Sequence, residues 1–599
     1  MSGKKTFGLV LKSLFIGGKA RSVLEEELIQ SPAKAAFKNF MSQKLAVAGA
    51  VIFILVVLSC IILSFVFPLN LNYVDMTQIN VPPGFYFLDV PSALKNNALV
   101  VDPGATFGAG IDRDGKVYVW GQLASSTASE KLYRIPKDIG KLKDISCGLD
   151  HVLALGEDGK TIYTWGNDRL GLTNIPMEMK NREIVQIEAG ENISVALGKN
   201  GKLYVWGSQT LIKISTRLAH DEKIEKFALN SVTALVLTEN RNVYALTSAD
   251  VPVGRIPSDI AGRVIDVAAS KDSGAAITDD GRVHVWGSKD YGVQEVPEEI
   301  QGHAVSITAG RYHYSAVLDD GTVTSWGMTN FGQSDAPSVV NAAEVRSAFL
   351  NNIAVQADGK VVTWGLKGYP LGSDQYGRDV FRRLISGGQV TLTVGAVSVI
   401  IAGIIGVIIG GISGYYMGKV DMFLMRATEV VSAIPFLPLA IILSAIIGNR
   451  ISESMRIFMI MLILGLLSWP GLARLTRAQI LSERENEFVT AAKAMGVKES
   501  GIIFRHILPN VIAVLLVSLT LDLATCMLIE STLSFLGFGV QEPNATWGNM
   551  LNSCVDSTVI RKYWWRWVFP SITLGLATIS VNLIGDGLRD AIDPKANDR

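Results

Sequence analysis

The 599-residue chain is 49% hydrophobic and has a mean hydropathy of +0.31, which is too apolar for an ordinary soluble protein and predicts a membrane-spanning part. Its 55 Lys and Arg residues balance 55 Asp and Glu residues, so no bulk charge indicates a nucleic-acid partner. The cysteines form no CxxC pair, which argues against a zinc site and a disulfide framework, and we expect packing residues and no metal. They are Cys60, Cys147, Cys526 and Cys554.

The amino-terminal segment, residues 1–44, carries eight Lys and Arg against three Glu and has no signal-peptide pattern. The positive-inside tendency predicts that this segment is cytoplasmic. Residues 45–67 follow without a single charge. A helix rises about 1.5 Å per residue and a bilayer core is about 30 Å thick, so we expect the first transmembrane helix here.

A repeat of about 40 residues occupies residues 85–367. Each copy has an Ala/Gly-rich strand, a tight turn such as Asp-Gly, and a strand ending in Trp-Gly, as in DGKVYVWG, DGRVHVWG and DGKVVTWG. The tryptophans are Trp120, Trp165, Trp206, Trp286, Trp326 and Trp364. The long gap after Trp206 holds a degenerate copy, NRNVYALT, in which Leu246 takes the tryptophan position. Asp-Gly turns between alternating strands indicate hairpins, so seven units predict a seven-bladed β-propeller, with an open solenoid as the alternative.

These units resemble the regulator of chromosome condensation repeat family, whose blades carry a G-x-x-H-x-x-A-L, D-G and W-G pattern. His151 and His313 occupy the histidine position of that pattern. We expect the tryptophans and histidines to pack between blades, and we do not carry over any nuclear exchange-factor activity. Arg311, Tyr312 and Tyr314, in a connecting turn, are our candidates for contact on a propeller face.

Five further apolar spans follow residue 383, at residues 384–418, 430–449, 457–473, 507–540 and 568–584. Six spans place both termini on one side of the membrane. The loop at residues 474–506 is basic, like the amino-terminal segment, so we expect both to be cytoplasmic and the repeat to be extracytoplasmic. The predicted fold is an all-α membrane domain with an inserted all-β propeller.

The cytoplasmic loop contains a predicted short helix, residues 483–495. Ser482 and Glu485 have capping-box spacing for its start, and Gly496 suits a left-handed exit. Lys498 begins a second helix. The alternative is a merely solvated helix between two spans.

Asp522 and Glu530 lie within the fifth span, where carboxylates are costly unless they face a cavity or a partner. Eight residues apart, they can face one side of a helix. They are candidates for the lining of a translocation path, and hydrogen bonding to a neighbouring span is the structural alternative.

Segments at residues 32–84 and 368–597 resemble the inner-membrane permease subunit of binding-protein-dependent ABC importers, in the dipeptide, oligopeptide and nickel branch. The segments GYPLGSDQYGRDV, AAKAMG, FRHILPN and IESTLSFLGFG carry the resemblance. In that family the A-A-x-x-x-G loop forms a coupling helix that docks on the ATP-hydrolysing subunit. The implied coupling residues are Glu487, Thr490, Ala491, Ala492, Lys493 and Gly496, although Thr490 stands where the general motif has Glu. Asp374, Gly377, Arg378 and Asp379 form the family-signature segment.

The resemblance implies a type I importer permease in a bacterial cell membrane, residues 368–599 forming its core with the first span. The implied partners are a second homologous permease, two ABC ATPases that hold ATP and Mg²⁺, a solute-binding protein and membrane lipid. The chain has no phosphate-cradling G-x-x-x-x-G-K-[ST] loop, so we expect a transport subunit without its own ATPase site and without a cofactor.

The expected cargo is a peptide, with oligosaccharide or nickel as alternatives. We expect the propeller to dock the solute-binding protein or to capture substrate; binding of cell-wall material is a third possibility. A membrane-anchored receptor or adhesin is the alternative from another functional class.

Overall fold

The computed structural model describes residues 32–124, 126–208, 222–230, 233–247, 250–447 and 451–592. Most of the predicted cytoplasmic amino-terminal segment and the end of the third predicted span, residues 448–449, lie outside these ranges. The chain forms two compact units, which we describe separately: the propeller unit, Asn70–Phe381, and the helical unit, Met1–Leu69 with Arg382–Arg599.

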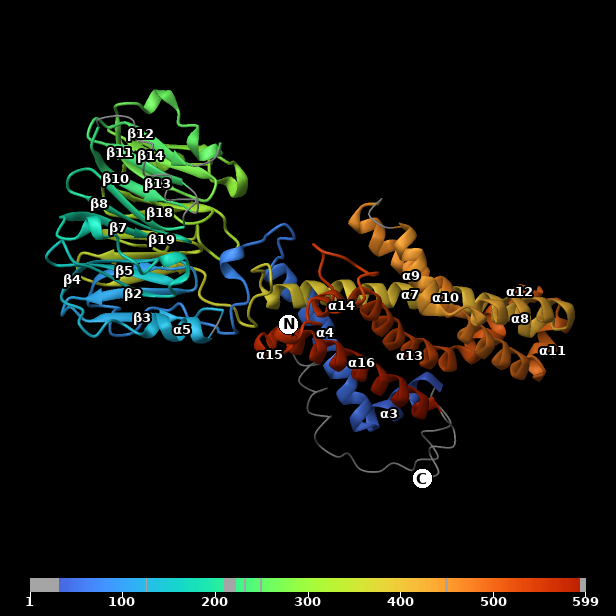
Figure 1. Ribbon diagram of the computed structural model, residues 1–599. Coiled ribbons are helices and arrows are strands. Elements are labelled where there is room, and N and C mark those ends of the chain that lie inside the picture. Colours follow the sequence, from blue (N-terminus) through green and yellow to red (C-terminus); the bar gives the residue numbers. More distant parts are fainter. Residues whose placement is uncertain are drawn as a thin grey trace, which may run out of the picture. The chain divides into compact units, whose positions relative to one another are not determined.

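The propeller unit contains seven antiparallel three-stranded sheets, each built from strands consecutive in sequence (Figure 1). This confirms the predicted propeller, including the degenerate fourth blade. The blades are β1–β3 (Ala98–Pro103, Phe107–Asp112, Val117–Gly121), β4–β6 (Leu142–Cys147, His151–Gly156, Ile162–Gly166), β7–β9 (Ile184–Ala189, Ile193–Gly198, Leu203–Gly207), β10–β12 (Ile224–Leu229, Thr233–Thr238, Val243–Thr247), β13–β15 (Val264–Ala269, Ser273–Thr278, Val283–Gly287), β16–β18 (Ala304–Ala309, His313–Leu318, Val323–Gly327) and β19–β21 (Ala342–Ala348, Asn351–Gln356, Val361–Gly365). A short helix, α5 (Ser126–Tyr133), follows the first blade.

The tryptophans join most blades to the connector before them through a hydrogen bond. Five of the six indoles donate to a carbonyl of that connector, as Trp165 Nε1 does to Leu132 O at 2.9 Å and Trp286 Nε1 does to Val253 O at 2.8 Å. The indole of the last blade, Trp364, donates instead to Ser325 Oγ in β18 of the blade before it. Leu246 in the fourth blade is buried but has no such donor. The predicted packing role of the tryptophans is therefore what the structure shows.

The same type of backbone hydrogen bond joins neighbouring blades and closes the ring between the last blade and the first. Ile184 N donates to Gly159 O between the second and third blades at 2.7 Å, and Ala98 N donates to Gly359 O between the first and last blades at 3.0 Å. The ends of the ring also meet, because Gly84 N donates to Tyr369 O at 2.8 Å. The blades thus form a closed insert whose entry and exit segments meet at one isolated bridge.

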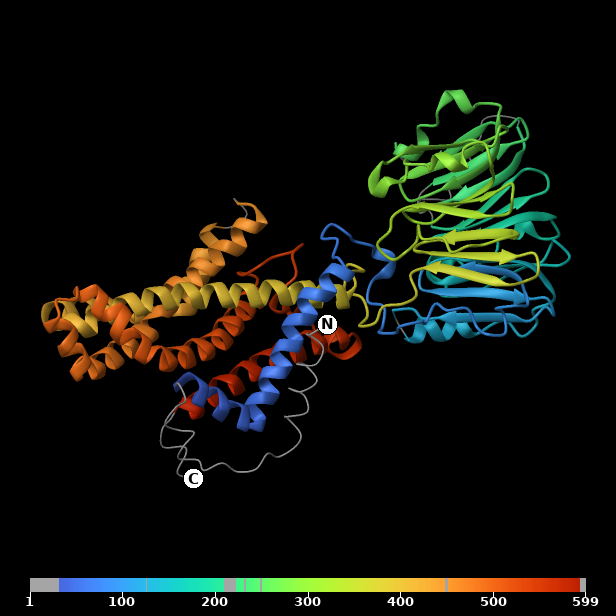
Figure 2. The ribbon, with the colours of Figure 1, turned by 180° about the vertical axis from the view of Figure 1, so that it is seen from behind.

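The helical unit has five helices that are long and apolar enough to cross a membrane, or six when one bent pair is counted as a span, among the residues described. Its helices are α3 (Pro32–Ser42), α4 (Lys44–Val66), α7 (Val380–Tyr416), α8 (Gly418–Ala433), α9 (Phe436–Ile447), α10 (Glu453–Glu483), α11 (Glu487–Ala494), α12 (Glu499–Gly501), α13 (Leu508–Phe535), α14 (Trp547–Asn552), α15 (Ser557–Lys562) and α16 (Trp565–Ile592), with one π-helical turn at Ile502–Ile507. Helices α4 and α16 lie side by side (Figures 1 and 2).

Close helix packing depends on glycines in α7. A Cβ at Gly410 would lie 2.3 Å from Ala473 O of α10, and one at Gly414 would lie 2.8 Å from Arg477 O. Small residues let two helix backbones approach, which is the usual way to hold apolar helices together in lipid. The sequence places these glycines four residues apart, on one face of the helix.

Two sequence expectations about the helices are wrong. The third span is not one helix, because α8 and α9 meet at a 76° bend at Pro435. The residue before a proline avoids the helical region, and Ile434 is extended. Ser482 does not cap a helix either, since α10 continues through Glu483 and the short helix begins at Glu487 with Asn486 as its N-cap.

Candidate functional site

The predicted coupling helix is present as α11, and it has one packed face and one open face. Val489 and Ala492 are buried in an apolar cluster with Ile480 and Ile503. Ala491 is exposed on the opposite side, and Met495 is 74% exposed just after the helix. A helix packed on one side therefore offers the other for contact.

The remaining predicted coupling residues surround that open face. Glu487, Thr490, Lys493 and Gly496 are all exposed. Gly496 has a φ of 74°, as expected for a left-handed exit, and a Cβ there would meet nothing within 4 Å. Lys493 lies over the ring of Tyr415, with Nζ 5.4 Å from the ring centre. The coupling role of these residues stays a prediction.

Ion pairs and hydrogen bonds join the helix ends near α11. The sequence did not predict these contacts. Arg477 of α10 binds Asp421 of α8 through two hydrogen bonds of 2.5 and 2.6 Å, and Ser413 of α7 also donates to Asp421. Arg484 donates to Tyr415 O at 2.6 Å. These contacts tie three helix ends together beside the loop. The basic residues of the loop were the available signal.

The two carboxylates of the fifth span lie in different surroundings within α13. Glu530 is fully buried and accepts hydrogen bonds from Ser534 Oγ at 2.7 Å and from Ser531 Oγ at 3.3 Å. Asp522 is only partly buried. Thr391 of α7 and Thr546 also hydrogen-bond to Glu530, as the structural alternative expected. Glu530 is thus satisfied within the helical unit, whereas Asp522 remains the better candidate for a path lining.

The family-signature segment forms the turn before α7. Asp374 Oδ1 accepts from Tyr376 N at 2.8 Å and from Arg378 N at 3.0 Å, and its Oδ2 accepts from Arg378 Nε at 2.7 Å. Gly377 has a φ of 72°, and a Cβ there would lie 1.9 Å from Asp75 O, so only glycine fits. Asp379 accepts from Phe381 N at 2.8 Å at the start of α7. This arrangement is structural.

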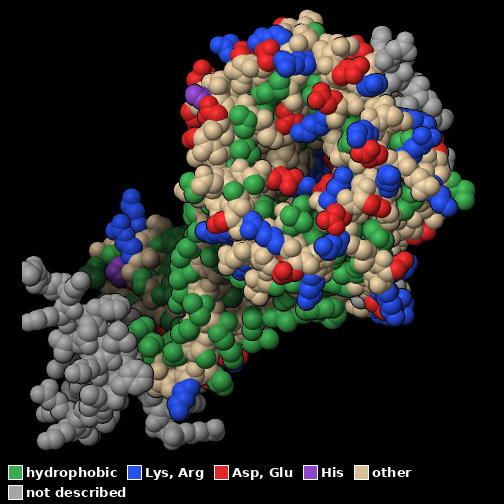
Figure 3. Space-filling view, turned by 90° about the vertical axis from the view of Figure 1, so that its left-hand side faces the viewer, with side chains coloured by type: hydrophobic (Ala, Val, Ile, Leu, Met, Phe, Trp, Pro, Cys, Tyr) green, Lys and Arg blue, Asp and Glu red, His purple; other side chains and the backbone are tan. Residues whose placement is uncertain are grey.

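Charged side chains line the inner strands of the propeller. Figure 3 looks onto one face of the molecule, where Lys, Arg, Asp and Glu gather around a central hollow of the propeller unit. Arg346 of β19 lies 2.8 Å from Asp144, 2.7 Å from Glu344 and 3.6 Å from Asp102. Burial raises the pKa of Asp102 to about 7, although Arg346 opposes that shift. The interior therefore holds more acid than base in this layer.

The inner strands of neighbouring blades are joined by hydrogen bonds from a backbone N–H of one blade to a side-chain oxygen of the other. Cys147 N donates to Asp102 Oδ2 at 2.7 Å, and Leu229 N donates to Glu188 Oε1 at 3.2 Å. The side-chain amide of Gln186 makes the same kind of contact, since its Oε1 accepts a hydrogen bond from Phe227 N at 3.1 Å. These contacts give the inner polar residues a structural role in the ring.

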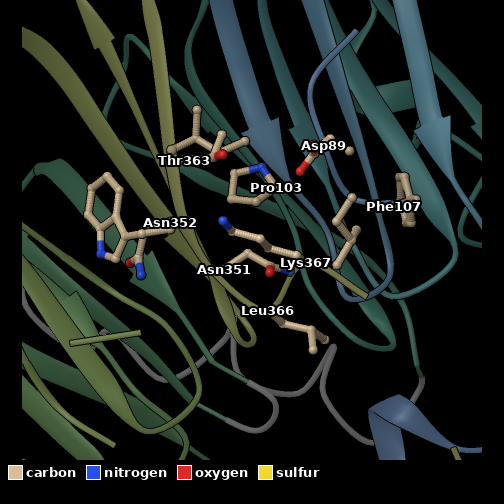
Figure 4. Close-up of a pocket in the computed structure, with 12 residues that line it drawn as sticks. Asp89, Pro103, Phe107, Asn351, Asn352, Thr363, Leu366 and Lys367 are labelled. Atoms are coloured by element: carbon tan, nitrogen blue, oxygen red, sulfur yellow. The ribbon is translucent and has the colours of Figure 1, made fainter. Parts of the chain in front are cut away.

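A cavity with about 90 Å³ of room for water lies where the inner strands end. Its walls include Glu188, Glu191, Asn230, Lys271, Arg311 and Phe349. A second, smaller space lies between the first and last blades and is lined by residues such as Asn351 and Lys367 (Figure 4). At about 20 Å³ it has room for about one water molecule, so it is a gap in the packing.

Comparisons with known proteins identify the helical unit. Residues 406–598 match the binding-protein-dependent transport system inner membrane component, and residues 31–83 match the N-terminal TM domain of oligopeptide transport permease C. The chain is 41% identical over 246 residues to a putative peptide permease protein of Brucella ovis, which corresponds to 41% of this chain and 78% of that relative. The chain belongs to the family of binding-protein-dependent inner-membrane permeases.

Other relatives of the permease agree. The oligopeptide transport system permease protein OppC of Escherichia coli (strain K12) is 42% identical over 228 residues, covering 38% of this chain and 73% of that protein.

The regulator of chromosome condensation (RCC1) repeat matches residues 142–171, 184–210, 264–293 and 304–333. Among solved structures, the CRINKLY WD40 ectodomain of the Arabidopsis thaliana receptor kinase ACR4 is 18% identical, covering 45% of this chain and 98% of that chain at a TM-score of 0.36. The family matches and the seven sheets make the permease a multi-pass membrane protein with an inserted RCC1-like propeller.

The propeller-face candidates of the permease are not exposed, which corrects their expected placement. Tyr314 is fully buried and its hydroxyl lies 2.7 Å from Ser273 Oγ, and Tyr312 is 9% exposed. Arg311 is paired with Asp75 and Glu191. Arg311 nevertheless lines the cavity, so a contact role for it stays a prediction.

The two repeat histidines of the permease are interior packing residues, as expected. His151 Nε2 lies 3.0 Å from Ser194 Oγ in the next blade, and His313 Nε2 lies 2.8 Å from Asn352 Oδ1 in the next blade. Burial lowers the pKa of each histidine to about 4. Both rings are therefore neutral near pH 7.

Proposed function

We propose that the permease forms one half of the membrane path of an ATP-driven peptide importer, and that α11 receives the motion of an ATPase subunit. The names of the relatives, which are peptide, oligopeptide and dipeptide permeases, support the cargo class. Nickel or an oligosaccharide is the alternative cargo. The partners are a second homologous permease, two ABC ATPases carrying ATP and Mg²⁺, and an external solute-binding protein.

The observation that carries this proposal is the two-faced packing of α11. Its buried face transmits force into the cluster of Val489, Ala492 and Ile503, which lies against α10 and α13. Its open face presents Ala491 with no bulky side chain, so a partner surface can approach the helix backbone closely. ATP-driven movement of that partner would then reorient the spans.

A charge placed on the open face tests the coupling role. Ala491→Arg should abolish co-purification of the ATPase subunits and ATP-dependent uptake of a labelled peptide by the reconstituted importer. Ser500→Arg is the matched control, because Ser500 is also exposed in the same loop but lies beyond α11. A complex that survives Ala491→Arg with full uptake would contradict the coupling role of α11.

We further propose that α11 is cytoplasmic and the propeller extracytoplasmic, on the strength of the basic loop. Labelling tests this cleanly, because Cys60, Cys147, Cys526 and Cys554 are all buried and give little background. A membrane-impermeant maleimide should label Met177→Cys, at a position that is 93% exposed, in intact cells. Met495→Cys should react only after lysis; the reverse pattern would invert the topology.

The propeller should act on the cargo or on the solute-binding protein before transport. The pairing of Gly84 with Tyr369 supports treating it as a removable insert. Replacing residues 85–368 with a short Gly-Ser linker should leave the ATPase complex assembled but lower peptide uptake at low peptide concentration. Unchanged uptake at every concentration would exclude a transport role for the propeller.

A further inference from the structure

Among the residues that the structure describes, the cavity at the ends of the inner strands contains one acidic group that forms no ion pair. Among the described residues, Glu188 has no ion-pair partner and makes one hydrogen bond, which its Oε1 accepts from Leu229 N at 3.2 Å. Its Oε2 has no hydrogen-bond partner in that part of the chain. Burial raises the pKa of Glu188 to about 8; Asp102 raises it as well, whereas Lys226 and Arg346 lower it. The carboxyl is therefore largely protonated near pH 7 and releases its proton when a cation binds beside it.

The basic residues nearest to Glu188 are already engaged. Lys226 is paired with Asp266, and Arg346 is held by Asp144 and Glu344. A carboxylate in such a place gains most from a cation that enters from outside.

The positive groups on the opposite wall are engaged as well. Arg311 Nε lies 3.1 Å from Asp75, and its Nη1 contacts Glu191. Lys271 Nζ lies 3.0 Å from Tyr312 Oη and 3.7 Å from Asp272. The charged residues that line the cavity are thus two acids, Glu188 and Glu191, and two bases, Lys271 and Arg311. Of these four described residues, Glu188 alone forms no ion pair.

The volume and the lining of the cavity indicate which kind of cation can bind there. A water needs about 10–15 Å³ of such volume, so about 90 Å³ admits about six to nine water-sized atoms. The described residues contain no group of three or more His, Cys, Asp or Glu that could hold a metal ion. The walls also include Leu229, Ala269, Ala309 and Phe349, which suit an aliphatic side chain beside the charge. An ammonium group on a small apolar residue matches this combination.

We propose that this cavity binds the free amino terminus of a short peptide, with Glu188 as the counter-charge to the α-ammonium group. This inference rests on the proposed import of peptides and assigns the propeller a share in it, as the place where cargo is first held. The first residue of the peptide enters the cavity, and the rest of the peptide extends out of its mouth.

Binding of trialanine to the full-length permease in nanodiscs tests the proposal. Trialanine should bind, whereas N-acetyl-trialanine, which lacks the ammonium group, should bind at least tenfold more weakly. Glu188→Gln should lose at least tenfold in affinity for trialanine while keeping the Leu229 contact, because Gln186 accepts a backbone hydrogen in the same way. Glu183→Gln, at an exposed acid before the same strand, should bind normally.

Hydrogen exchange locates the binding. Trialanine should slow exchange in residues 184–191 and 224–230, and this protection should persist in Asp522→Asn, which alters the candidate membrane path. Equal binding of the acetylated peptide, unchanged affinity in Glu188→Gln, or equal competition by spermidine would overturn the proposal.

Uptake of labelled peptide by the assembled importer is measured in parallel. Uptake without trialanine binding in the cavity would overturn the cavity proposal and leave the import function standing. Trialanine binding without uptake of any peptide would overturn the import function and leave the cavity assignment standing.

Discussion

Arg311 Nε lies 3.1 Å from Asp75 Oδ1, and the two side chains are 9% and 0% exposed. Asp75 also accepts from Thr77 N at 3.0 Å and from Thr77 Oγ1 at 2.7 Å. The pair therefore anchors the segment that precedes the first blade to a turn of the sixth. Residues 236 positions apart in the sequence are joined by one buried ion pair.

Asp75→Asn should destabilise the propeller by about 2 kcal/mol. Removing one partner of a buried pair typically costs about 3–5 kcal/mol, but Arg311 keeps Glu191 as a second partner. The opening free energy of strand β16 from hydrogen exchange in the full-length protein measures the change. Glu130→Gln, in a pair whose side chains are 71% and 63% exposed, is the control and should cost less than about 0.5 kcal/mol. Equal effects of the two substitutions would contradict the anchoring role.

Gly410→Ala should weaken the contact between α7 and α10, because the new methyl group would lie 2.3 Å from Ala473 O. Overpacking of this kind costs about 1–3 kcal/mol. The neighbouring Gly411→Ala is the matched control, since its nearest contact would be an ordinary 3.5 Å to Ile503. It should be neutral or stabilising by up to about 1 kcal/mol through helix propensity. The unfolding midpoint of the detergent-solubilised protein measures both, and a stable Gly410→Ala would refute the close approach.

Trp286→Leu should destabilise the fifth blade less than Trp286→Ala. The indole is 5% exposed and donates to Val253 O at 2.8 Å, and either change removes that bond. Leu fills part of the space, as Leu246 does in the fourth blade, so we expect about 2 kcal/mol against about 3–5 kcal/mol for Ala. Hydrogen exchange in β13–β15 reports the loss, and Tyr86→Leu, at a position that is 65% exposed, should have little effect.

The propeller should lose stability as pH falls from about 6.5 to about 4. Burial lowers the pKa of His151 and of His313 from 6.5 to about 4, so in this window the unfolded chain takes up protons that the folded chain refuses. Each histidine can contribute up to about 3 kcal/mol. Glu188 acts in the opposite direction, because its raised pKa of about 8 makes the folded state bind a proton more readily below that pH.

The difference between wild type and a His151→Gln, His313→Gln variant isolates the histidine contribution. The variant should lose less blade stability than wild type between pH 7 and pH 5, as measured by hydrogen exchange corrected for intrinsic rates. An identical pH dependence in both proteins would show that the two rings titrate in the folded state as they do in the unfolded one.

Local signals were sufficient wherever one contact repeats along the chain. Asp-Gly turns and Trp-Gly strand ends located the blades, and the spacing alone revealed the fourth, in which Leu246 replaces tryptophan. The bend at Pro435 was also predictable from the local sequence, because the residue before a proline avoids the helical conformation. It was missed because the span was predicted from its apolar composition alone.

Tertiary contacts decided the rest. Ser482 and Glu485 have the spacing of a cap, yet α10 continues past Ser482 because Ile480 and Arg477 are held by its neighbours. Tyr314 lies in a polar turn sequence that looks exposed, and its burial depends on Ser273, 41 residues away. The sequence did not predict Glu188 as a binding residue. Its lack of an ion pair depends on Lys226 and Arg346 being paired with other acids, and the sequence of one strand does not show those contacts.

The insert between the bridged residues Gly84 and Tyr369 delays the synthesis of the later spans. About 300 residues must be translated between the end of α4 and the start of α7, which takes roughly 15–60 s at roughly 5–20 residues per second. During that delay α4 waits in the bilayer without α16, although a Cβ at Gly49 would come within 2.8 Å of Leu583 in the finished protein. The first span is therefore exposed without its packing partner for longer than in a permease that lacks the insert.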